Sequence, residues 1–280
     1  EGREYIDFLG GISVASVGHC HPKVVEAVRV QSGELQHVSN LFYTAPMVAL
    51  AKRLSESSLQ GKVFICNSGT EANECAIKIA RKHARARGVE SPEIVSFEND
   101  FHGRSYGALS ATPGLATNPD FAPMLPGFRS VAFDDAAALR EAVGESTAAV
   151  LIEPIQGEAG VFPVSDEVLL AARQACDETG ALLIFDEVQT GVGRTGSLWA
   201  FEQGPVRPDV ITTAKALGGG VAIGACIGNP VTGDVLGAGD HGSTFAAGPV
   251  AAGAALAVLD LVDDPEMMRR IRLLGATLME

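Results

Sequence analysis

An alternation of short apolar runs with longer amphipathic segments limits the fold of this chain more than any other feature of its sequence. The candidate strands are the apolar runs at 63–66, 94–97, 130–133, 149–152, 182–185, 210–213 and 222–227. The candidate helices are the segments at 22–37, 45–55, 71–87, 135–143, 166–179 and 249–261. Several of the runs are apolar on both faces, which is typical of strands covered by helices on both sides. We therefore predict an α/β fold with a mostly parallel central sheet.

Composition and charge exclude several classes of protein. The chain has 280 residues, 46% of them hydrophobic, which excludes intrinsic disorder. Its net charge of −13 argues against a nucleic-acid partner, because such a partner requires a basic face. The low-charge stretch at 242–259 contains Pro249 and predicts a buried helix and its approach, so we expect no membrane partner. Five scattered cysteines without a CxxC pair predict a cytoplasmic location and no disulfide framework.

One short segment carries side chains that can bind metals. His19, Cys20 and His21 are adjacent, but neighbouring acids do not complete a recognisable ligand set. A turn before a helix that begins at Pro22 explains the segment better. We therefore expect no metal site.

Ligands bind at the carboxyl ends of the strands in sheets of this kind, so the residues after each predicted strand are candidates. After the run at 63–66, a turn of small residues opens a helix. Backbone N–H groups at a helix N-terminus attract anions, Gly69 allows close approach, and Thr70 adds a hydroxyl. Ordinary capping by Ser68 or Thr70 explains the same residues, and both interpretations stay open.

Two acids, Asp186 and Glu187, follow the apolar run at 182–185. A carboxylate at the end of a buried strand is partly desolvated and needs a cation or strong donors. A protonated ring nitrogen is one such cation. Capping of the next segment and metal binding are the alternatives, and the second is weakened because no phosphate-loop lysine is present.

Lys215 follows the run at 210–213 among small and apolar residues. Desolvation and a nearby cation lower the pKa of a lysine and make it nucleophilic enough to form a Schiff base. The three glycines at 218–220 let the chain turn beside a bulky ligand. A lysine that extends its ammonium into solvent is the alternative.

Two further loops carry candidate ligands. After the run at 94–97, Phe101 can lie against a planar ring and Arg104 can bind a carboxylate, although a packed loop with a surface arginine explains both. Ser243 and Thr244 can bind a phosphate or cap the next helix. Together these groups match pyridoxal phosphate part by part. The anion site suits its phosphate, the strand-end carboxylate its ring nitrogen, the buried lysine its aldehyde and the aromatic side chain its ring face.

Five sequence blocks occur here in the order typical of one known family: 68–73 (SGTEAN), 101–104 (FHGR), 153–158 (EPIQGE), 186–191 (DEVQTG) and 242–244 (GST). With them the chain resembles the class III, ornithine-type aminotransferases. The resemblance implies the pyridoxal-phosphate-dependent transferase fold type I. It implies that residues 1–45 form part of a small domain and a linker, and that 46–280 form the large cofactor-binding α/β domain. The C-terminal small domain of the family, roughly a hundred residues, is expected to be missing from this chain.

The resemblance also implies catalytic roles for two residues. Lys215 would hold pyridoxal 5'-phosphate as a Schiff base and then act as the base and acid of the proton shift. Asp186 would pair with the N–H of the pyridine ring and keep the ring electron-poor.

By the same resemblance, five residues would complete the cofactor site. Gly69 and Thr70 would bind the phosphate. Phe101 and Val188 would cover the two faces of the ring, and Gln189 would donate to the ring oxygen.

For the substrates, the resemblance implies that Arg104 binds the α-carboxylate of the amino acid. Glu158 would be a gate that lets one pocket accept the amino donor and 2-oxoglutarate alternately. Thr244 and Ser243 would reach the phosphate or the substrate of the neighbouring subunit, so the expected assembly is a homodimer with shared active sites.

The segments at 39–44 and 101–105 resemble the branch of the family that acts on N2-acetyl-L-ornithine in arginine biosynthesis. The implied reaction is a ping-pong transfer of the δ-amino group to 2-oxoglutarate through a Schiff base. Ornithine, succinylornithine and 4-aminobutyrate remain alternative donors. A truncated cofactor-binding fragment with impaired turnover is a further alternative, because the arginine that pairs with Glu158 and binds 2-oxoglutarate would lie in the missing domain. A nicotinamide-dependent dehydrogenase is disfavoured, since the turn at Gly69 lacks the G-x-G-x-x-G pattern.

Overall fold

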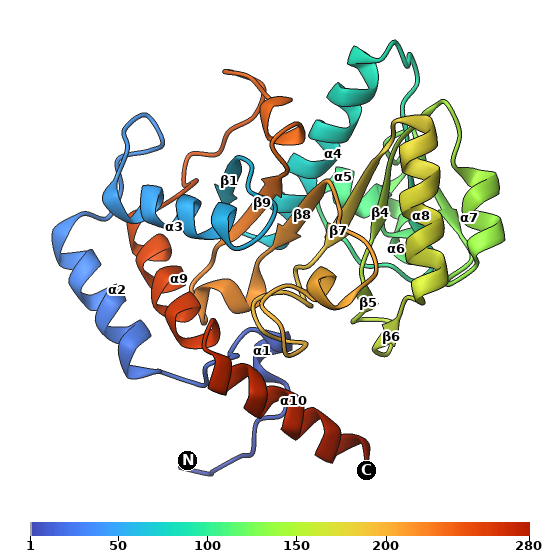
Figure 1. Ribbon diagram of the computed structural model, residues 1–280. Coiled ribbons are helices and arrows are strands. Elements are labelled where there is room, and N and C mark those ends of the chain that lie inside the picture. The colour runs from blue at the N-terminus through green and yellow to red at the C-terminus, as the bar shows by residue number, and fades with distance from the viewer. Residues whose placement is uncertain (1) are drawn as a thin grey trace.

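A seven-stranded sheet with helices on both faces forms the centre of the protein (Figure 1). The computed structural model describes residues 2–280, and Glu1, the first residue of the predicted N-terminal segment, lies outside the described residues. Across the sheet the strands follow the order β1 (Val63–Cys66), β9 (Gly224–Gly228), β8 (Val210–Thr213), β7 (Leu182–Asp186), β4 (Thr147–Ile152), β2 (Glu93–Phe97) and β3 (Phe128–Val131). Within this sheet only β9 runs opposite to the other six strands, so the predicted α/β fold with a mostly parallel sheet is confirmed.

Different helices cover the two faces of the sheet. One face is covered by α4 (Gly69–Ala86). The opposite face is covered by α3 (Ala45–Glu56), α7 (Ala136–Ala142), α8 (Asp166–Thr179) and α9 (Pro249–Val262). The helix α2 (Pro22–Glu34) lies against α9, outside this layer (Figure 1).

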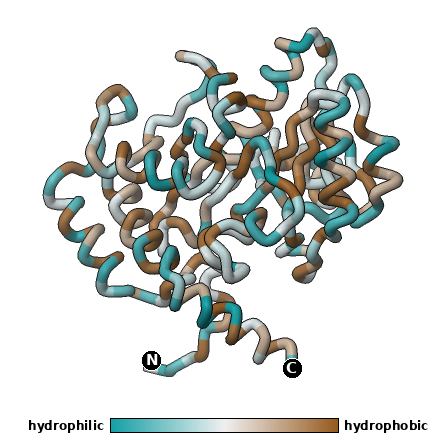
Figure 2. Tube along the Cα trace, viewed as in Figure 1, coloured by the Kyte–Doolittle hydropathy of each residue, from teal (hydrophilic) through white to brown (hydrophobic). Residues whose placement is uncertain are grey.

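The alternation of side chains along β7 explains which face of the sheet carries the side chain of Asp186, the last residue of this strand. Leu183 and Phe185 pack with the cluster that includes α8, whereas Leu182 and Ile184 pack with the cluster that includes α4. Because side chains alternate between the two faces of a strand, Asp186 lies on the α4 face like Ile184. Figure 2 shows hydrophobic residues gathered on these central strands.

Most predicted elements match the structure within a few residues. The strands at 63–66 and 210–213 and the helix at 166–179 have the predicted bounds. The strand predicted at 130–133 instead spans Phe128–Val131, because it aligns Phe128 with Ile94 and Val131 with Phe97 of β2. Pairing with a neighbouring strand therefore overrides the local apolar pattern.

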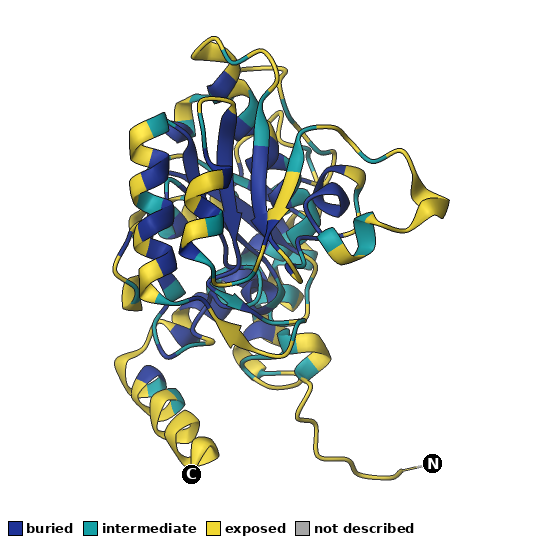
Figure 3. Cartoon of the chain, turned by 90° about the vertical axis from the view of Figure 1, so that its right-hand side faces the viewer, coloured by how far each residue is buried: buried dark blue, intermediate teal, exposed yellow. Residues whose placement is uncertain are grey.

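The remaining elements are short or lie at the periphery: α1 (Gly10–Ser13), α5 (Tyr106–Ser110), α6 (Pro113–Ala116), α10 (Pro265–Met279), the hairpin of β5 (Ile155–Gln156) and β6 (Phe162–Pro163), and the 3₁₀ turns η1 (Pro119–Phe121), η2 (Ala200–Gln203), η3 (Lys215–Gly218) and η4 (Thr232–Asp234). Figure 3 shows that α10 and the irregular segment that precedes α1 from residue 2 are mostly exposed. Among residues 2–280, no helix combines the length and the apolar character needed to cross a bilayer.

Candidate active site

A cavity of about 490 Å³ opens at the carboxyl edge of the parallel strands. The predicted site residues on its wall are Gly69, Thr70, Phe101, Arg104, Asp186, Val188, Gln189 and Lys215. These residues come from the segments that follow β1, β2, β7 and β8. Parallel strands end at the same edge of a sheet, and for this reason residues far apart in the chain meet around one cavity.

Asp186, the last residue of β7, is held at the floor of the cavity by three donors. Asn73 Nδ2 and His102 Nδ1 lie 2.7 and 2.8 Å from Asp186 Oδ2, and the backbone N–H of Val188 donates to Oδ1 at 3.0 Å. The Asp186 side chain is only 3% exposed. A buried carboxylate is tolerated only with such donors, so the surroundings stabilise its charge.

Asn73, which was not predicted as a site residue, joins the floor to α4. Its Nδ2 also donates to the backbone oxygen of His102 at 2.7 Å, and its Oδ1 accepts from Thr212 Oγ1 at 2.8 Å. Thr212 is the partner of Asp186 in the β7–β8 register. An asparagine among the alanines and isoleucines of a buried helix face was the signal available in the sequence.

His102 lies buried between two carboxylates. Its Nδ1 is 2.8 Å from Asp186 Oδ2, and its Nε2 is 3.4 Å from Asp100 Oδ2. Burial acts to lower the pKa of His102, but the charges of Asp100 and Asp186 and the hydrogen bond with Asp186 outweigh burial and raise the pKa to about 10. The two carboxylates therefore favour the protonated form of His102, in which Nδ1 donates to Asp186. A lone histidine in a loop carried no such information in the sequence.

The two acids after β7 have different roles. Glu187 is fully buried and accepts from the backbone N–H groups of Ala200 and Phe201 at 2.6 and 2.9 Å. Burial raises the pKa of Glu187 to about 7. The capping interpretation is therefore correct for Glu187, whereas Asp186 lines the cavity.

Lys215 begins the turn η3 with a backbone φ of 39°. This left-handed conformation is costly for a residue with a Cβ, and it is found preferentially at functional sites. The Nζ atom lies 3.6 Å from Glu158 Oε1, and the side chain is 19% exposed. The ammonium therefore faces the cavity rather than open solvent, which excludes the alternative of a lysine extended into water.

The N-terminus of α4 forms another part of the wall. Ser68 is its N-cap and accepts from the N–H of Glu71 at 3.3 Å, so capping is the role of Ser68. The first N–H groups of a helix have no acceptor within the helix, and here they belong to Gly69 and Thr70. A Cβ at Gly69 would lie 2.7 Å from Val188 Cγ1, so glycine is required for the approach of Val188. The helix end thus suits an anion beside an apolar ring.

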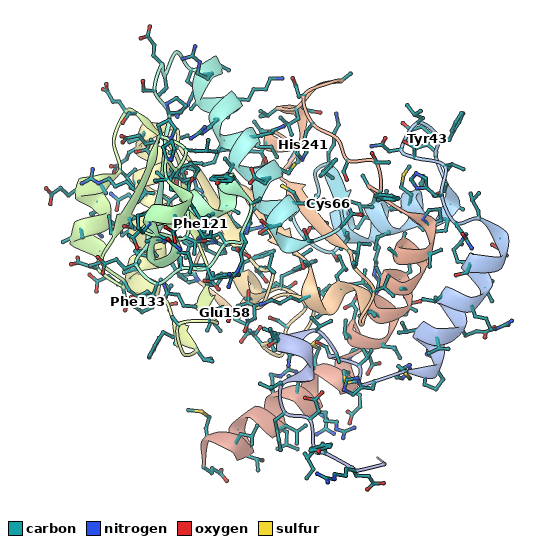
Figure 4. All side chains as sticks on the ribbon, turned by 180° about the vertical axis from the view of Figure 1, so that it is seen from behind. Tyr43, Cys66, Phe121, Phe133, Glu158 and His241 are labelled. Atoms are coloured by element: carbon teal, nitrogen blue, oxygen red, sulfur yellow. The ribbon has the colours of Figure 1, made fainter. Side chains whose placement is uncertain are left out.

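Glu158, Gln189 and Arg104 lie around the rim of the cavity. Gln189 Nε2 donates to Glu158 Oε1 at 3.2 Å, and the Glu158 side chain is 43% exposed (labelled in Figure 4). Arg104 is exposed, with its guanidinium carbon 6.0 Å from the centre of the Phe101 ring. Two predicted substrate ligands, Arg104 and Glu158, thus lie at the same site.

The structure does not bring Thr244 into the cavity of its own chain. Ser243 Oγ accepts from Asn67 Nδ2 at 3.1 Å, and Asn67 is part of the wall. Thr244 is exposed. Nearby, the ring of His241 lies 4.6 Å from that of Phe64 (His241 is labelled in Figure 4). The role of Thr244 at the site of a neighbouring subunit stays a prediction.

The segment His19–His21 has a structural role. His19 Nε2 lies 2.7 Å from Asp7 Oδ2, and His21 Nδ1 accepts from the N–H of Lys23 at the start of α2. The predicted turn before a helix at Pro22 is confirmed. In the described part of the chain, no group of three or more His, Cys, Asp or Glu side chains is arranged to hold a metal ion.

The residues of the cavity fit pyridoxal phosphate. The α4 N-terminus suits its phosphate, the buried carboxylate of Asp186 suits a protonated ring nitrogen, and the Lys215 ammonium suits its aldehyde. Val188 and Phe101 supply apolar surface for a flat ring. When bound, the cofactor withdraws electrons and makes a proton on the carbon next to the substrate nitrogen acidic.

Three known proteins resemble the chain over nearly its whole length. Acetylornithine aminotransferase from Methanocaldococcus jannaschii is 50% identical over 265 residues, which are 94% of this chain and 67% of that protein. An ornithine aminotransferase structure from Toxoplasma gondii, reported with partial occupancy of PLP at its active site, has a TM-score of 0.92 and 37% identity over 99% of this chain and 67% of that chain. The N-acetylornithine aminotransferase structure from Stenotrophomonas maltophilia has a TM-score of 0.84 and 38% identity over 99% and 68% of the two chains.

A family model matches as well. The model described as aminotransferase class-III covers residues 1–280. The fold, the site and the relatives agree with this match, although the chain spans only about two thirds of the length of those relatives. The chain belongs to the class III aminotransferases, which use pyridoxal phosphate as their cofactor.

Proposed function

We propose that the chain carries the cofactor-binding part of an aminotransferase that moves the δ-amino group of N2-acetyl-L-ornithine to 2-oxoglutarate. The products would be N-acetylglutamate 5-semialdehyde and L-glutamate. The observation that carries the proposal is a cavity whose wall contains both Lys215 and the buried Asp186, whose carboxylate accepts three hydrogen bonds. The acetylated donor is favoured because the acetylornithine aminotransferase of M. jannaschii is 50% identical to this chain, against 37% for the ornithine aminotransferase of T. gondii.

The residues of the chain would divide the work of this reaction. Asp186, held in place by Asn73 and His102, would hold the proton on the ring nitrogen. Lys215 Nζ would take the acidic proton from the substrate carbon and deliver it to the carbon on the cofactor side of the nitrogen. Positioned proton transfer of this kind contributes about 10²–10⁴-fold to a rate. Arg104 would bind the α-carboxylate of the donor, which its exposed guanidinium can reach with two N–H groups.

Glu158 would act as the gate between the two substrates. Its carboxylate lies 3.6 Å from Lys215 Nζ and accepts from Gln189. The negative charge of Glu158 repels a second carboxylate in the pocket, so Glu158 favours the amino donor. A cation that attracts the Glu158 carboxylate away from Lys215 would end this preference. Alternation of donor and acceptor in one pocket gives ping-pong kinetics.

We also propose a cytoplasmic homodimer that takes part in arginine biosynthesis. The loop of Ser243 and Thr244 would contribute to the site of the partner, because Thr244 is exposed beside its own cavity rather than inside it. The free cysteines Cys20, Cys66, Cys75, Cys176 and Cys226 suit a reducing compartment. The division into a segment at 1–45 and a large domain at 46–280 is part of the same proposal.

A comparison of donors tests the proposed substrate. The purified chain, loaded with pyridoxal phosphate, is given 2-oxoglutarate with N-acetylornithine, succinylornithine, ornithine or 4-aminobutyrate. We expect kcat/KM for N-acetylornithine to exceed that for ornithine by about tenfold or more, which is the discrimination a shaped pocket supplies. Equal or faster turnover of ornithine would contradict the assignment. A protein that binds the cofactor yet turns over no donor would instead support the fragment with impaired turnover.

A further inference from the structure

Glu153 is a buried acid on the cavity wall that the proposed reaction does not use. It follows β4 and is 4% exposed. Its Oε1 accepts from the backbone N–H of Phe101 at 2.8 Å, and its Oε2 accepts from the backbone N–H of Gly157 at 3.3 Å. These two N–H groups belong to different loops, so a single carboxylate bridges the loop after β2 and the turn of the β5–β6 hairpin.

One end of this bridge holds the ring-face residue. Phe101 is on the cavity wall, and the Arg104 guanidinium lies against its ring. The bond from Phe101 N–H to Glu153 therefore fixes the backbone from which both side chains extend. A bond to a buried carboxylate is stronger than one between neutral groups, so this anchor resists loop motion.

The other end of the bridge reaches the catalytic lysine through direct contacts. A Cβ at Gly157 would lie 2.4 Å from the side-chain amide of Gln189, so the Gly157 backbone lies directly against that amide. Gln189 Nε2 donates to Glu158 Oε1 at 3.2 Å, and Glu158 lies 3.6 Å from Lys215 Nζ. The position of Gly157 thus sets where Gln189 and Glu158 lie beside the ammonium.

A second anchor holds the hairpin at its base rather than at its turn. Gln156 Nε2 donates to the backbone oxygen of Glu98 and to Asp100 Oδ1, both at 2.8 Å. The turn beyond it is exposed, with Val161 70% exposed. Gln156 therefore ties the base of the hairpin to residues 98 and 100 of the loop after β2, while Glu153 sets where the turn of the hairpin lies relative to Phe101.

We propose that Glu153 is a positioning residue that holds Phe101 and the turn of Glu158 in a fixed relation on two sides of the cofactor site. The inference rests on the proposed function for the roles of Phe101 and Glu158. Without this carboxylate, Gln156 still holds the base of the hairpin, but the turn of the hairpin and the backbone of Phe101 are no longer held together, so the cofactor ring loses a fixed contact surface. Cofactor affinity falls as a result, and the gate no longer returns to one position beside Lys215.

The variant Glu153→Gln tests the bridge directly. A glutamine has one acceptor oxygen and one donor NH₂ group. Its oxygen can accept from one of the two backbone N–H groups, but its NH₂ group then faces the other N–H group and leaves it without an acceptor. Amide hydrogen exchange is measured without substrate at about pH 8, above the pKa of Glu153, which burial and Asp186 raise to about 7. We expect exchange at Phe101 or Gly157 to accelerate by about ten- to a hundredfold. We also expect the affinity for pyridoxal phosphate, from its visible absorbance, to fall about tenfold.

The matched control is Glu187→Gln. Glu187 is also a buried carboxylate that accepts from two backbone N–H groups, those of Ala200 and Phe201, but it is not on the cavity wall. Its variant should accelerate exchange at Ala200 and Phe201 and leave Phe101 and Gly157 unchanged. A shorter acid, Glu153→Asp, keeps the charge and should fall between wild type and Glu153→Gln.

Two results would overturn the positioning role. One is unchanged exchange at both Phe101 and Gly157 in a folded Glu153→Gln protein whose β4 amides stay protected. The other is equal acceleration at these amides in the Glu187→Gln control, which would indicate general loosening. Because exchange needs no substrate, accelerated exchange in a protein that fails the donor comparison would overturn the proposed function and leave the bridge intact.

Discussion

The floor and the rim of the cavity differ in how firmly the protein holds them. On the floor, Asp186, Asn73 and His102 are buried and joined by hydrogen bonds between α4, β7 and the loop after β2. On the rim, Arg104 is exposed, and Glu158 is 43% exposed on a short hairpin. The floor therefore has one arrangement, set by packing, while the exposed side chains of the rim can change rotamer on a fixed backbone. A site that alternates between two substrates needs both properties.

The largest effect on turnover is expected when the charge of the floor is removed. Asp186→Asn keeps the size of the side chain but loses the negative charge that would face a ring cation. We expect kcat to fall about 10²–10³-fold, as when one preorganised electrostatic group is lost, while the cofactor stays bound. Steady-state rates and the visible spectrum measure the two effects. Wild-type turnover would show that the partner of the ring nitrogen is another residue. It would also show that the floor is no more important for turnover than the rim.

A smaller effect is expected at the rim. Arg104→Ala removes a guanidinium that would bind the donor carboxylate, so kcat/KM for the donor should fall about ten- to a hundredfold. The free energy of unfolding should change by no more than about 0.5 kcal/mol, because the side chain is exposed. Arg129→Ala, an exposed arginine on β3 away from the cavity, is the control and should change neither quantity. A large loss of stability in Arg104→Ala would mean that the rim is as rigid as the floor.

A third effect is on stability rather than on turnover, and it concerns the pH dependence of unfolding. The pKa of His102 is about 10 in the folded protein and 6.5 ordinarily, so the folded state binds this proton more tightly. Its contribution to stability is complete below pH 6.5 and is lost as the pH rises through 10, at up to about 1.4 kcal/mol per pH unit. Urea unfolding across this range should therefore show a steeper decline in wild type than in His102→Gln. Parallel curves would show that His102 is neutral and that the floor carries no such cation.

Prediction from sequence succeeded where a signal was local. The apolar runs located the strands, and the residues after them contained Lys215 and Asp186. It was less successful where several segments meet: the donors to Asp186 come from α4 and from the loop after β2, and no spacing along the chain relates them. Glu153 was missed for the same reason, since its partners lie on two other loops.

The amino-acid sequence alone determined the α/β class, the strand ends that carry the chemistry and the family, because periodicity and short motifs are properties of contiguous residues. Only the tertiary structure decided which of two adjacent acids lines the cavity. Side chains alternate along β7, and the helix over one face supplies Asn73 to Asp186, while Glu187 turns to the backbone of residues 200 and 201. It also decided the charge of His102, because that charge depends on two carboxylates that folding brings within 3.4 Å of its ring.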